Sequence, residues 1–583
     1  MSRLFILALA VALLSACAGT ATVPDPVAVA PETEGQPEPP EPVERPFPDD
    51  SVYPLLVAEF ALRRRDYDVA LENYLTQAQI LRDAGVSAHT THLTQFMRRE
   101  REAMEAAQLW VELEPDNAEA QNTLANLLLR QGRSLEALPH LAAVQRLGSP
   151  ARFPTLLNGF EQLDAQQQTE LVEGINALAR EWPDNTQLLM TQALLHAEFE
   201  QFPQALKKLD ALFEIEPYQP QAILLEARVL MATGDKKPFA RLEQAVADKP
   251  KDQELRLQYA RLLTASDMPA ARKQFEILSA QSPRDGDLLL SLALINRETG
   301  DDVAAKAYLK QMLALQQRVD EAHFYLGRIA EDQDDPQQAI SHYLQVEGQA
   351  EFLSANLRIG QILIGNGEQA QAQALFLEQR KAYPDRAEQI FSLEADLLTQ
   401  ADEVPSALQV LNQGVRQFPD STTLLYARSM AAEQLGDLAL MERDLRAIIN
   451  NDPDNATALN ALGYTLANRT ERYTEAYELV SRALALQPDE PAILDSMGWV
   501  LYRQGQYDKA LEYLNRAYAE YPDPEVAAHL GEVLWVSGNT EAATNVWRGA
   551  LLRDPEHKVL QATLERLGVA PLDTGMPTAE PQP

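Results

Sequence analysis

Residues able to do chemistry are few and scattered in this chain of 583 residues. The single cysteine, Cys17, excludes an internal disulfide, a cysteine-based zinc site and a CxxC redox pair. His89 and His92 could share a helical face, but no third metal ligand accompanies them. The acidic cluster at 331–335 lacks the central glycine of an EF-hand loop, so we interpret it as a solvated turn. The sequence therefore predicts no metal site and no cofactor.

Motifs of hydrolytic catalysis are also missing. GxSxG, SxxK and HExxH do not occur, and the nearest approach, GVSAH at 85–89, is expected in a loop. The chain has 50 Lys and Arg against 86 Asp and Glu, and its net charge of −36 repels phosphate backbones. We therefore expect no catalytic residue, no nucleic-acid partner and no small-molecule substrate.

Two ladders of recurring residues indicate which elements organise the chain. Prolines that would end a helix recur every 33 to 35 residues, apart from one gap of 101 residues that fits three units. These prolines are Pro115, Pro150, Pro183, Pro217, Pro250, Pro283, Pro384, Pro419, Pro453, Pro488, Pro522 and Pro555. About twelve residues before such prolines stand Ala70, Ala103, Ala137, Ala205, Ala271, Ala305, Ala339, Ala372, Ala407, Ala476, Ala510 and Ala543.

The ladders have a physical explanation in helix-turn-helix units. A small residue allows two helices to cross closely, and alanine provides it without loss of helix propensity. Glycines five residues earlier suit the left-handed end of the first helix; they are Gly132, Gly300, Gly367, Gly505 and Gly538. An aspartate after the proline can cap the next helix. The pattern predicts stacked helical pairs.

The stretch at 491–522, PAILDSMGWVLYRQGQYDKALEYLNRAYAEYP, resembles a tetratricopeptide repeat, with Gly498, Ala510 and Ala517 in consensus positions. Divergent units exist, and the fourth offers Leu171 where the small residue belongs. About 518 residues divided by a 34-residue period give about 15 units. The resemblance implies an all-α, right-handed superhelical solenoid of about 15 such repeats at 51–568.

The first residues carry the marks of export. Arg3 and the apolar run at 4–14 indicate a signal peptide at 1–16, too short to span a bilayer as a helix. The following LSAC resembles the lipobox of bacterial lipoproteins, which implies an acylated Cys17. Because Ala18 rather than aspartate follows, the resemblance implies the periplasmic face of the outer membrane. Proline and glutamate at 17–50 predict a tether, and 569–583 is expected to be a disordered tail.

Two surfaces are candidates for binding. Wall positions of the repeat family lie three residues before the conserved glycine and one and four after it. In the last three full units they are Asn460, Tyr464, Ala467, Asp495, Trp499, Tyr502, Ala528, Glu532 and Trp535. Their aromatic content predicts a partner-binding concave wall, and the alternative is that some of them pack against the neighbouring repeat. Trp547 is expected in the core.

The other candidate is the first helix, which no earlier repeat covers. Leu56 and Phe60 on it are expected either to dock a partner or to be buried within the first unit.

Lipobox, tether and repeats together, with the stretch LNALGYTLANRTERYTEAYELV, resemble a family of large outer-membrane repeat lipoproteins. That family includes the binding partner of the periplasmic carboxyl-terminal processing protease. The resemblance implies an adaptor that activates the protease and presents protein substrates such as peptidoglycan hydrolases. From the two candidate surfaces we expect Leu56 and Phe60 to dock the protease and the wall to receive the substrate. Two alternatives remain: a structural scaffold for exopolysaccharide secretion or outer-membrane protein assembly, and an envelope hydrolase with an unrecognised site.

Overall fold

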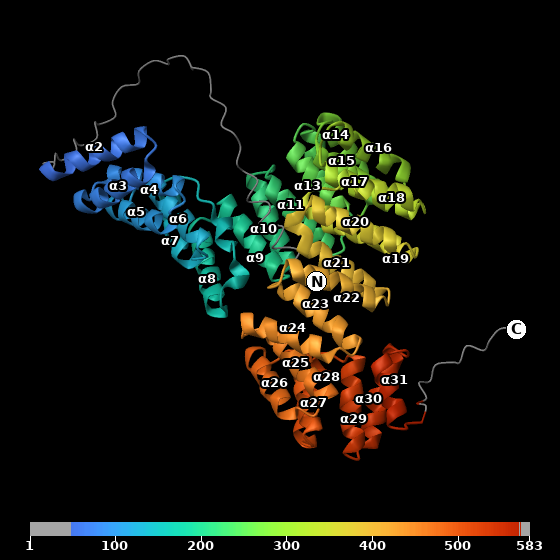
Figure 1. The fold of residues 1–583 in the computed structure, drawn as a ribbon. Helices are drawn as coiled ribbons and strands as arrows, with labels where there is room; N and C mark the ends of the chain where they lie inside the picture. Colours follow the sequence, from blue (N-terminus) through green and yellow to red (C-terminus); the bar gives the residue numbers. More distant parts are fainter. Residues whose placement is uncertain (1–47, 571, 573–583) are drawn as a thin grey trace, which may run out of the picture. The chain divides into compact units, whose positions relative to one another are not determined.

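A computed structural model describes residues 48–570 and residue 572 (Figure 1). The chain divides into two compact units, one ending at residue 283 and the other beginning at residue 284. In the described residues every regular element is a helix, and consecutive helices pack as hairpins joined by short turns. The all-α repeat fold expected from the ladders is therefore confirmed.

The helices of the first unit are α2 (Asp49–Arg63), α3 (Tyr67–Leu81), α4 (Ala84–Phe96), α5 (Glu100–Leu113), α6 (Ala118–Arg130), α7 (Ser134–Arg146), the 3-10 turns η1 (Phe153–Leu157) and η2 (Phe160–Gln162), α8 (Ala165–Glu181), α9 (Thr186–Glu198), α10 (Phe202–Ile215), α11 (Pro220–Ala232), α12 (Ala240–Asp248), α13 (Gln253–Leu263) and α14 (Met268–Gln281).

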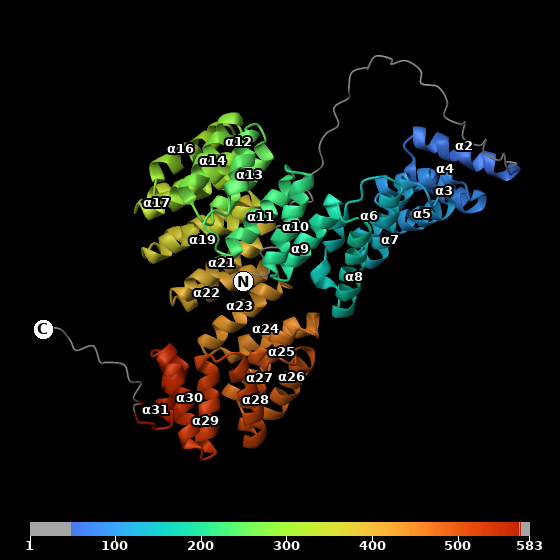
Figure 2. The same cartoon turned by 180° about the vertical axis from the view of Figure 1, so that it is seen from behind.

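The helices of the second unit follow one another in chain order (Figure 2). They are α15 (Gly286–Glu298), α16 (Asp302–Ala314), α17 (Val319–Asp332), α18 (Pro336–Tyr343), α19 (Gln349–Gly365), α20 (Gln369–Ala382), the 3-10 turn η3 (Pro384–Arg386), α21 (Ala387–Gln400), α22 (Val404–Gln417), α23 (Thr422–Gln434), α24 (Leu438–Asn451), α25 (Ala456–Arg469), α26 (Tyr473–Leu486), α27 (Pro491–Arg503), α28 (Tyr507–Glu520), α29 (Pro524–Val536), α30 (Thr540–Arg553) and α31 (Lys558–Arg566).

The unit between α7 and α9 departs from the regular hairpin. Its first helix is replaced by η1 and η2, and only its second helix, α8, is regular. Leu171 stands at the crossing position of α8 and is fully buried. With this unit included, the described residues contain the expected 15 units, and α31 packs on α29 as a last single helix.

The alanine ladder and the glycines that precede it occupy the positions that the sequence predicts. The twelve alanines of the ladder are all buried, and Ala510 and Ala543 are 0% exposed. The five glycines of the ladder all have positive φ, from 72° at Gly132 to 93° at Gly538. They therefore end the first helices in the left-handed region that a side chain disfavours.

The predicted capping role of the aspartate after each proline is wrong in several units. The cap is the next residue instead, as at Asn117, Asn185 and Asn455. The side-chain oxygen of Asn117 accepts hydrogen bonds from the backbone N–H groups of Glu119 and Ala120 at 2.9 and 3.1 Å. The aspartate belongs to the turn that the proline opens, and the asparagine satisfies the free amides of the helix.

The GVSAH stretch at 85–89 is helical, so its expected placement in a loop is wrong. It lies in the first two turns of α4, and Asp83 caps that helix by accepting a hydrogen bond from the backbone N–H of Val86 at 3.0 Å. Of the acidic cluster at 331–335, interpreted as a solvated turn, residues 333–335 do form the exposed turn between α17 and α18, whereas Glu331 belongs to α17 and pairs with Arg358 at 2.7 Å.

Candidate functional site

Predicted wall residues from two successive first helices, α25 and α27, meet at His529 of the next first helix, α29, and the sequence analysis missed this histidine. The His529 side chain is buried, and its Nδ1 lies 2.9 Å from Asp495 Oδ2. Its Nε2 lies 3.3 Å from the Tyr464 hydroxyl. The imidazole stacks on Trp499, with ring centroids 4.2 Å apart. His529 follows Asp495 by 34 residues, one repeat length, and this spacing is the signal that could have revealed it.

Nearby carboxylates explain how the imidazole of His529 can be buried and still carry a proton. Burial alone would lower the pKa of His529, but Asp495, assisted by Glu525 and Glu532, outweighs burial and leaves that pKa raised. The Tyr464 hydroxyl donates to Glu525 Oε1 at 3.2 Å, and burial together with nearby carboxylates raises the pKa of Tyr464. The cluster therefore favours an imidazolium and a neutral phenol.

A second set of polar contacts, centred on Glu532, links the same region to the last helix, α31. Glu532 is buried and accepts hydrogen bonds from the Tyr502 hydroxyl at 3.1 Å and from Arg566 Nη1 of α31 at 2.9 Å. Burial and Glu532 raise the pKa of Tyr502 to about 12. Trp535 is partly buried against Trp547, which is 0% exposed as expected for a core residue.

The last units therefore form packed joints rather than an exposed aromatic patch. Trp499 is 5% exposed, and Asp495 and Glu532 are buried as well. Asn460 is partly buried, and its Oδ1 has no hydrogen-bond partner in the part of the chain that the structure describes. Packing against the neighbouring repeat, the alternative given by the sequence, holds for Trp499, because a side chain so covered cannot anchor a partner unless the joint opens.

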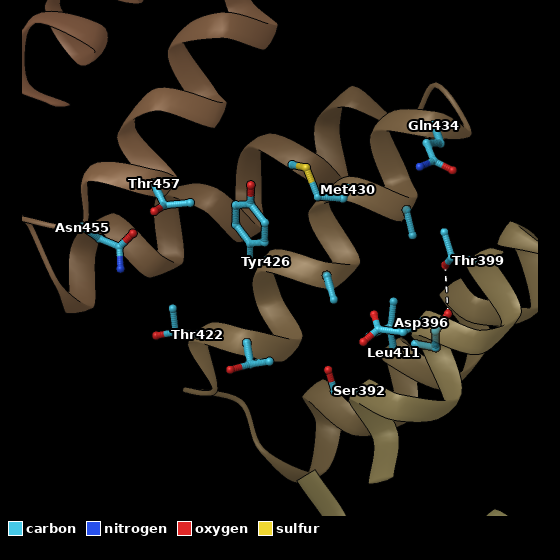
Figure 3. Close-up of a pocket in the computed structure, with 14 residues that line it drawn as sticks. Ser392, Asp396, Thr399, Leu411, Thr422, Tyr426, Met430, Gln434, Asn455 and Thr457 are labelled. Atoms are coloured by element: carbon cyan, nitrogen blue, oxygen red, sulfur yellow. Dashed lines mark hydrogen bonds between the residues drawn. The ribbon is translucent and has the colours of Figure 1, made fainter. Parts of the chain in front are cut away.

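A hollow of about 520 Å³ opens two repeats earlier, between α21, α23 and the start of α25 (Figure 3). It is lined by Ser392, Ala395, Asp396, Thr399, Leu411, Thr422, Thr423, Tyr426, Ala427, Met430, Ala431, Gln434, Asn455 and Thr457. Residues with hydroxyl, amide or carboxylate groups outnumber the aliphatic residues in this lining, although most of the lining surface is apolar. Such a mixture suits a polypeptide better than a compact apolar ligand.

Residues that line the hollow occupy the same repeat positions that were used to predict the concave wall. Ser392, Asp396 and Thr399 lie three residues before, one after and four after Ala395, which takes the place of the conserved glycine. Tyr426 and Met430 hold the corresponding positions one unit later. The register could therefore have located this site, but aromatic content drew the prediction to the last three units.

The first helix presents the other candidate surface. Leu56 is 51% exposed and Phe60 is 57% exposed, and Tyr53 on the same face is 76% exposed. On the opposite side of α2, Ala58 and Ala61 are buried in the first hairpin. The two predicted docking residues are therefore uncovered in the first unit rather than buried within it. Docking itself stays a prediction.

The remaining expectations from the sequence concern metal binding, membrane-spanning helices and the N-terminal anchor. In the described residues no group of three or more His, Cys, Asp or Glu side chains could hold a metal ion. The His89 ring instead packs on Tyr74, and that of His92 packs on Trp110. None of the described helices is both long and apolar enough to cross a membrane. Cys17, the signal peptide and nearly all of the tether and the tail lie outside the described residues.

The stacked hairpins define the class of the protein, an all-helical repeat scaffold. Models of the tetratricopeptide repeat match residues 260–315, 302–354, 454–522 and 496–557. A TPR repeat-containing protein of Pseudomonas aeruginosa is 39% identical over 493 residues, which cover 83% of this chain and 82% of the relative. The chain belongs to the tetratricopeptide-repeat protein family, whose stacked repeats serve as scaffolds for protein–protein interaction.

More distant similarities extend over much of the chain. Cellulose synthase 2 operon protein C of Komagataeibacter xylinus is 25% identical over 497 residues, which cover 76% of this chain and 36% of that protein. Among solved structures, the APC/C hetero-tetramer Cut9-Hcn1 contains a chain with a TM-score of 0.32 and 14% identity, with 89% of this chain and 96% of that chain covered. Yeast Tom70 matches with a TM-score of 0.29 and 15% identity, at 88% and 99% coverage.

Proposed function

We propose that this scaffold is an adaptor that holds a carboxyl-terminal processing protease and presents protein substrates to it, including peptidoglycan hydrolases. The observation that carries the proposal is the apolar face of α2, where Tyr53, Leu56 and Phe60 are exposed. Exposed aromatic and aliphatic side chains are the usual anchors of protein interfaces. The identity of the protease comes from the resemblance to the repeat lipoproteins.

Charge next to this face gives the partner a second feature to recognise. Three consecutive arginines at 63–65 are exposed at the end of α2, in a chain whose net charge is −36. A protease surface with an apolar cleft bordered by carboxylates would complement both features. The repeats beyond α2 remain available for substrate, so one chain can hold both proteins.

The proposal includes a location. An acyl group on Cys17 would hold the chain at the periplasmic face of the outer membrane, and the segment up to residue 50 would separate the repeats from the lipid. The support for this location is the lipobox-like LSAC and the preceding apolar run.

The test is a double substitution, Leu56→Asp with Phe60→Asp. Both side chains are exposed, so the helix should persist while two apolar contacts are lost, each worth about 1.5 to 3 kcal/mol when fully buried. We expect activation of the purified protease to fall more than tenfold, measured as the rate of substrate cleavage with and without the adaptor.

A matched control is Val303→Asp on α16, because Val303 is 83% exposed and lies in the compact unit that begins at residue 284, away from the first repeat in sequence. This variant should activate the protease like the unaltered chain. Full activation by the double variant would refute docking through α2.

The second candidate function is a structural scaffold for exopolysaccharide secretion or outer-membrane protein assembly. The similarity to the cellulose synthase operon protein favours its secretion form. Under this function no variant of the chain would alter proteolysis, and deletion of the gene would lower exopolysaccharide output. Turnover of a substrate by the purified chain alone would contradict both functions.

A further inference from the structure

The exposed side chains of α2 occupy repeat positions that are buried in later repeats. Tyr53 and Phe60 lie five residues before and two residues after Ala58, which precedes the ladder alanine Ala70 by twelve positions. Tyr53 is 76% exposed and Phe60 is 57% exposed. The equivalent residues of three later first helices are at most 7% exposed; they are Leu188 and Leu195 of α9, Ile493 and Val500 of α27, and Val526 and Val533 of α29. Helix α2 therefore has a stacking surface that no described residue covers.

In the later repeats the second helix of the preceding repeat covers this surface. Helix α26 packs on α27 and α28 packs on α29, across connections of four and three residues. Such short connections reverse the direction of the chain, so the covering helix is antiparallel to the helix that it covers. The neighbour that α2 lacks is thus a single antiparallel helix.

The residues before α2 do not supply this helix. Prolines from Pro24 to Pro48 are at most six positions apart, and proline inside a helix removes a hydrogen bond and clashes with the preceding turn. The sequence therefore predicts no helix of two turns in this segment. The apolar run at 4–14 is expected to leave with the signal peptide. The helix that covers α2 must come from another chain.

The last helix shows how an end of the repeats that needs no partner is built. Helix α31 packs on α29, and its exposed residues include Lys558, Gln561 and Glu565. A polar outer face keeps a terminal repeat soluble. The first helix has apolar side chains in the corresponding outer place, which marks an interaction surface.

The covering helices also show which side chains the partner offers. Ala517 of α28 is 0% exposed and packs in one cluster with Val526 of α29. A small residue of this kind leaves room for a bulky one on the helix that it meets. A second copy of α2 would instead set Tyr53 and Phe60 against equally bulky side chains, so a different protein fits the face better.

Arginines at the end of α2 indicate the charge of the partner helix. Arg63, Arg64 and Arg65 are exposed at the turn into α3. An antiparallel helix would begin beside this turn, and negative charge in its first turn would also offset the helix dipole. The next repeat gives a precedent, because Arg99 in the turn after α4 donates to Asp68 in the first turn of α3 at 3.0 Å.

We propose that α2 receives one amphipathic α-helix of a partner protein, which lies antiparallel to α2 in the place of a preceding second helix and has acidic residues in its first turn. Its apolar residues, spaced three, four and seven positions apart, contact Tyr53, Leu56 and Phe60. The inference rests on the proposed function only in that α2 is the docking face. It names the secondary structure and the charge of the segment that docks there.

The surface is tested with a second helix of this chain. Residues 507–523, which comprise α28 and its connection to α29, replace residues 1–50 and so precede Ser51 as they precede Pro524 in the repeats. We expect hydrogen exchange of α2 to slow by about tenfold or more relative to a chain that begins at Ser51, because the graft covers the stacking surface. Exchange of α31 should be unchanged.

Two variants of the graft check how it acts. Leu514→Pro in the grafted copy breaks its helix, so exchange of α2 should return to that of the ungrafted chain. Asp508 lies in the first turn of α28, so Asp508→Lys in the grafted copy sets a cation beside the arginines at 63–65. This variant should lower the protection of α2 by about twofold or more.

The partner is tested by photo-cross-linking. p-Benzoylphenylalanine replaces Tyr53 or Phe60, and the residue captured on the purified protease is mapped by mass spectrometry. Because seven positions span two turns, an antiparallel helix should be captured at two points about seven residues apart, in reversed order. Capture on an extended segment or on two separate elements would overturn the inference.

Other outcomes separate the inference from the proposed function. Unchanged exchange of α2 in the grafted chain would overturn the inference, even if Leu56→Asp with Phe60→Asp abolishes activation of the protease. A dimer of the unaltered chain that this double substitution dissociates would assign α2 to a second copy, and would also overturn it. A protected α2 in a grafted chain that still activates the protease would uphold the helix-binding surface and reject docking of the protease on α2.

Discussion

His529 and Asp495 form a buried ion pair that joins the first helices of two successive repeats, with Nδ1 and Oδ2 2.9 Å apart. The two residues are separated by 34 positions, so the pair spans one full repeat. Trp499 covers the imidazole from one side. Adjacent repeats are held mainly by apolar packing, and this joint adds a bond whose strength depends on protonation.

The joint between α27 and α29 should weaken as pH rises. The folded pKa of His529 lies above its usual value of 6.5, so its stabilisation is fully present below about 6.5 and is lost as pH rises through the folded pKa. Hydrogen exchange of α27 and α29, corrected for the intrinsic rate, should show falling protection across this range. His529→Gln should remove the trend.

His140 should show the opposite pH dependence of stability from His529. Burial lowers the pKa of His140 in α7, so its contribution to stability is present at high pH and is lost as pH falls. Protection in α27 and α29 that rises with pH, as expected for α7, would rule out a stabilising imidazolium at His529.

Two glycines in neighbouring helices should respond in opposite ways to alanine. A Cβ at Gly531 would lie 2.0 Å from the indole nitrogen of the fully buried Trp547, so Gly531→Ala should cost about 1 to 3 kcal/mol of unfolding free energy. A Cβ at Gly549 would meet only the Tyr518 hydroxyl, at 3.8 Å, so Gly549→Ala should stabilise α30 by about 0.5 to 1 kcal/mol. Urea unfolding measures both, and equal shifts would show that the packing of α29 on α30 is misassigned.

The alanine ladder leads to the same kind of experiment. Ala510 and Ala543 are fully buried at their crossings, so leucine at either position should overpack the hairpin by about 1 to 3 kcal/mol. Ala28→Leu, in the segment expected to be a tether, should leave the melting temperature unchanged. Equal melting temperatures for all three variants would contradict the repeat register.

The buried pair of Arg428 and Asp444 should be costly to break but dispensable as a whole. Both side chains are buried, so Arg428→Met leaves the buried carboxylate with only the exposed Arg443, 3.7 Å away, and should cost about 3 kcal/mol. Adding Asp444→Leu should recover most of that loss, measured as the midpoint of urea unfolding. If the double variant were as unstable as the single one, the pair would stabilise the fold by more than the mutual neutralisation of its two charges. Arg516→Met, at an exposed pair with Asp489, should cost less than about 1 kcal/mol.

The proposed location of the chain depends on Cys17. Cys17→Ala removes the only thiol that could be acylated, so the variant should leave the outer-membrane fraction and appear in the soluble periplasmic fraction. Immunoblots of washed membranes measure this. Retention of the variant in those membranes would exclude a lipid anchor at Cys17.

The fold followed from the sequence wherever one residue type had a single structural reason. Alanines such as Ala510 recur because the crossing is close, although Leu171 fills one crossing, and positive φ at Gly505 favours glycine, although residues such as Glu200 adopt it at the same position of another repeat. The binding surfaces were harder to predict, because an aromatic residue serves a joint as well as a partner. Trp499 fills a joint, whereas Asp396, which has no aromatic character, faces the hollow. Exposure depends on the neighbouring repeat, and one repeat contains no information about it.

The spacing of the first helices along the wall determines how many residues of an extended partner separate its contacts with successive repeats. Contacting helices such as α21 and α23 are about 10 Å apart, whereas an extended chain advances about 3.3 Å per residue. A partner therefore meets a new repeat at roughly every third residue. One unit of about 34 residues in the scaffold is thus matched to a triplet in its ligand, and the two residues between matched positions are free to vary.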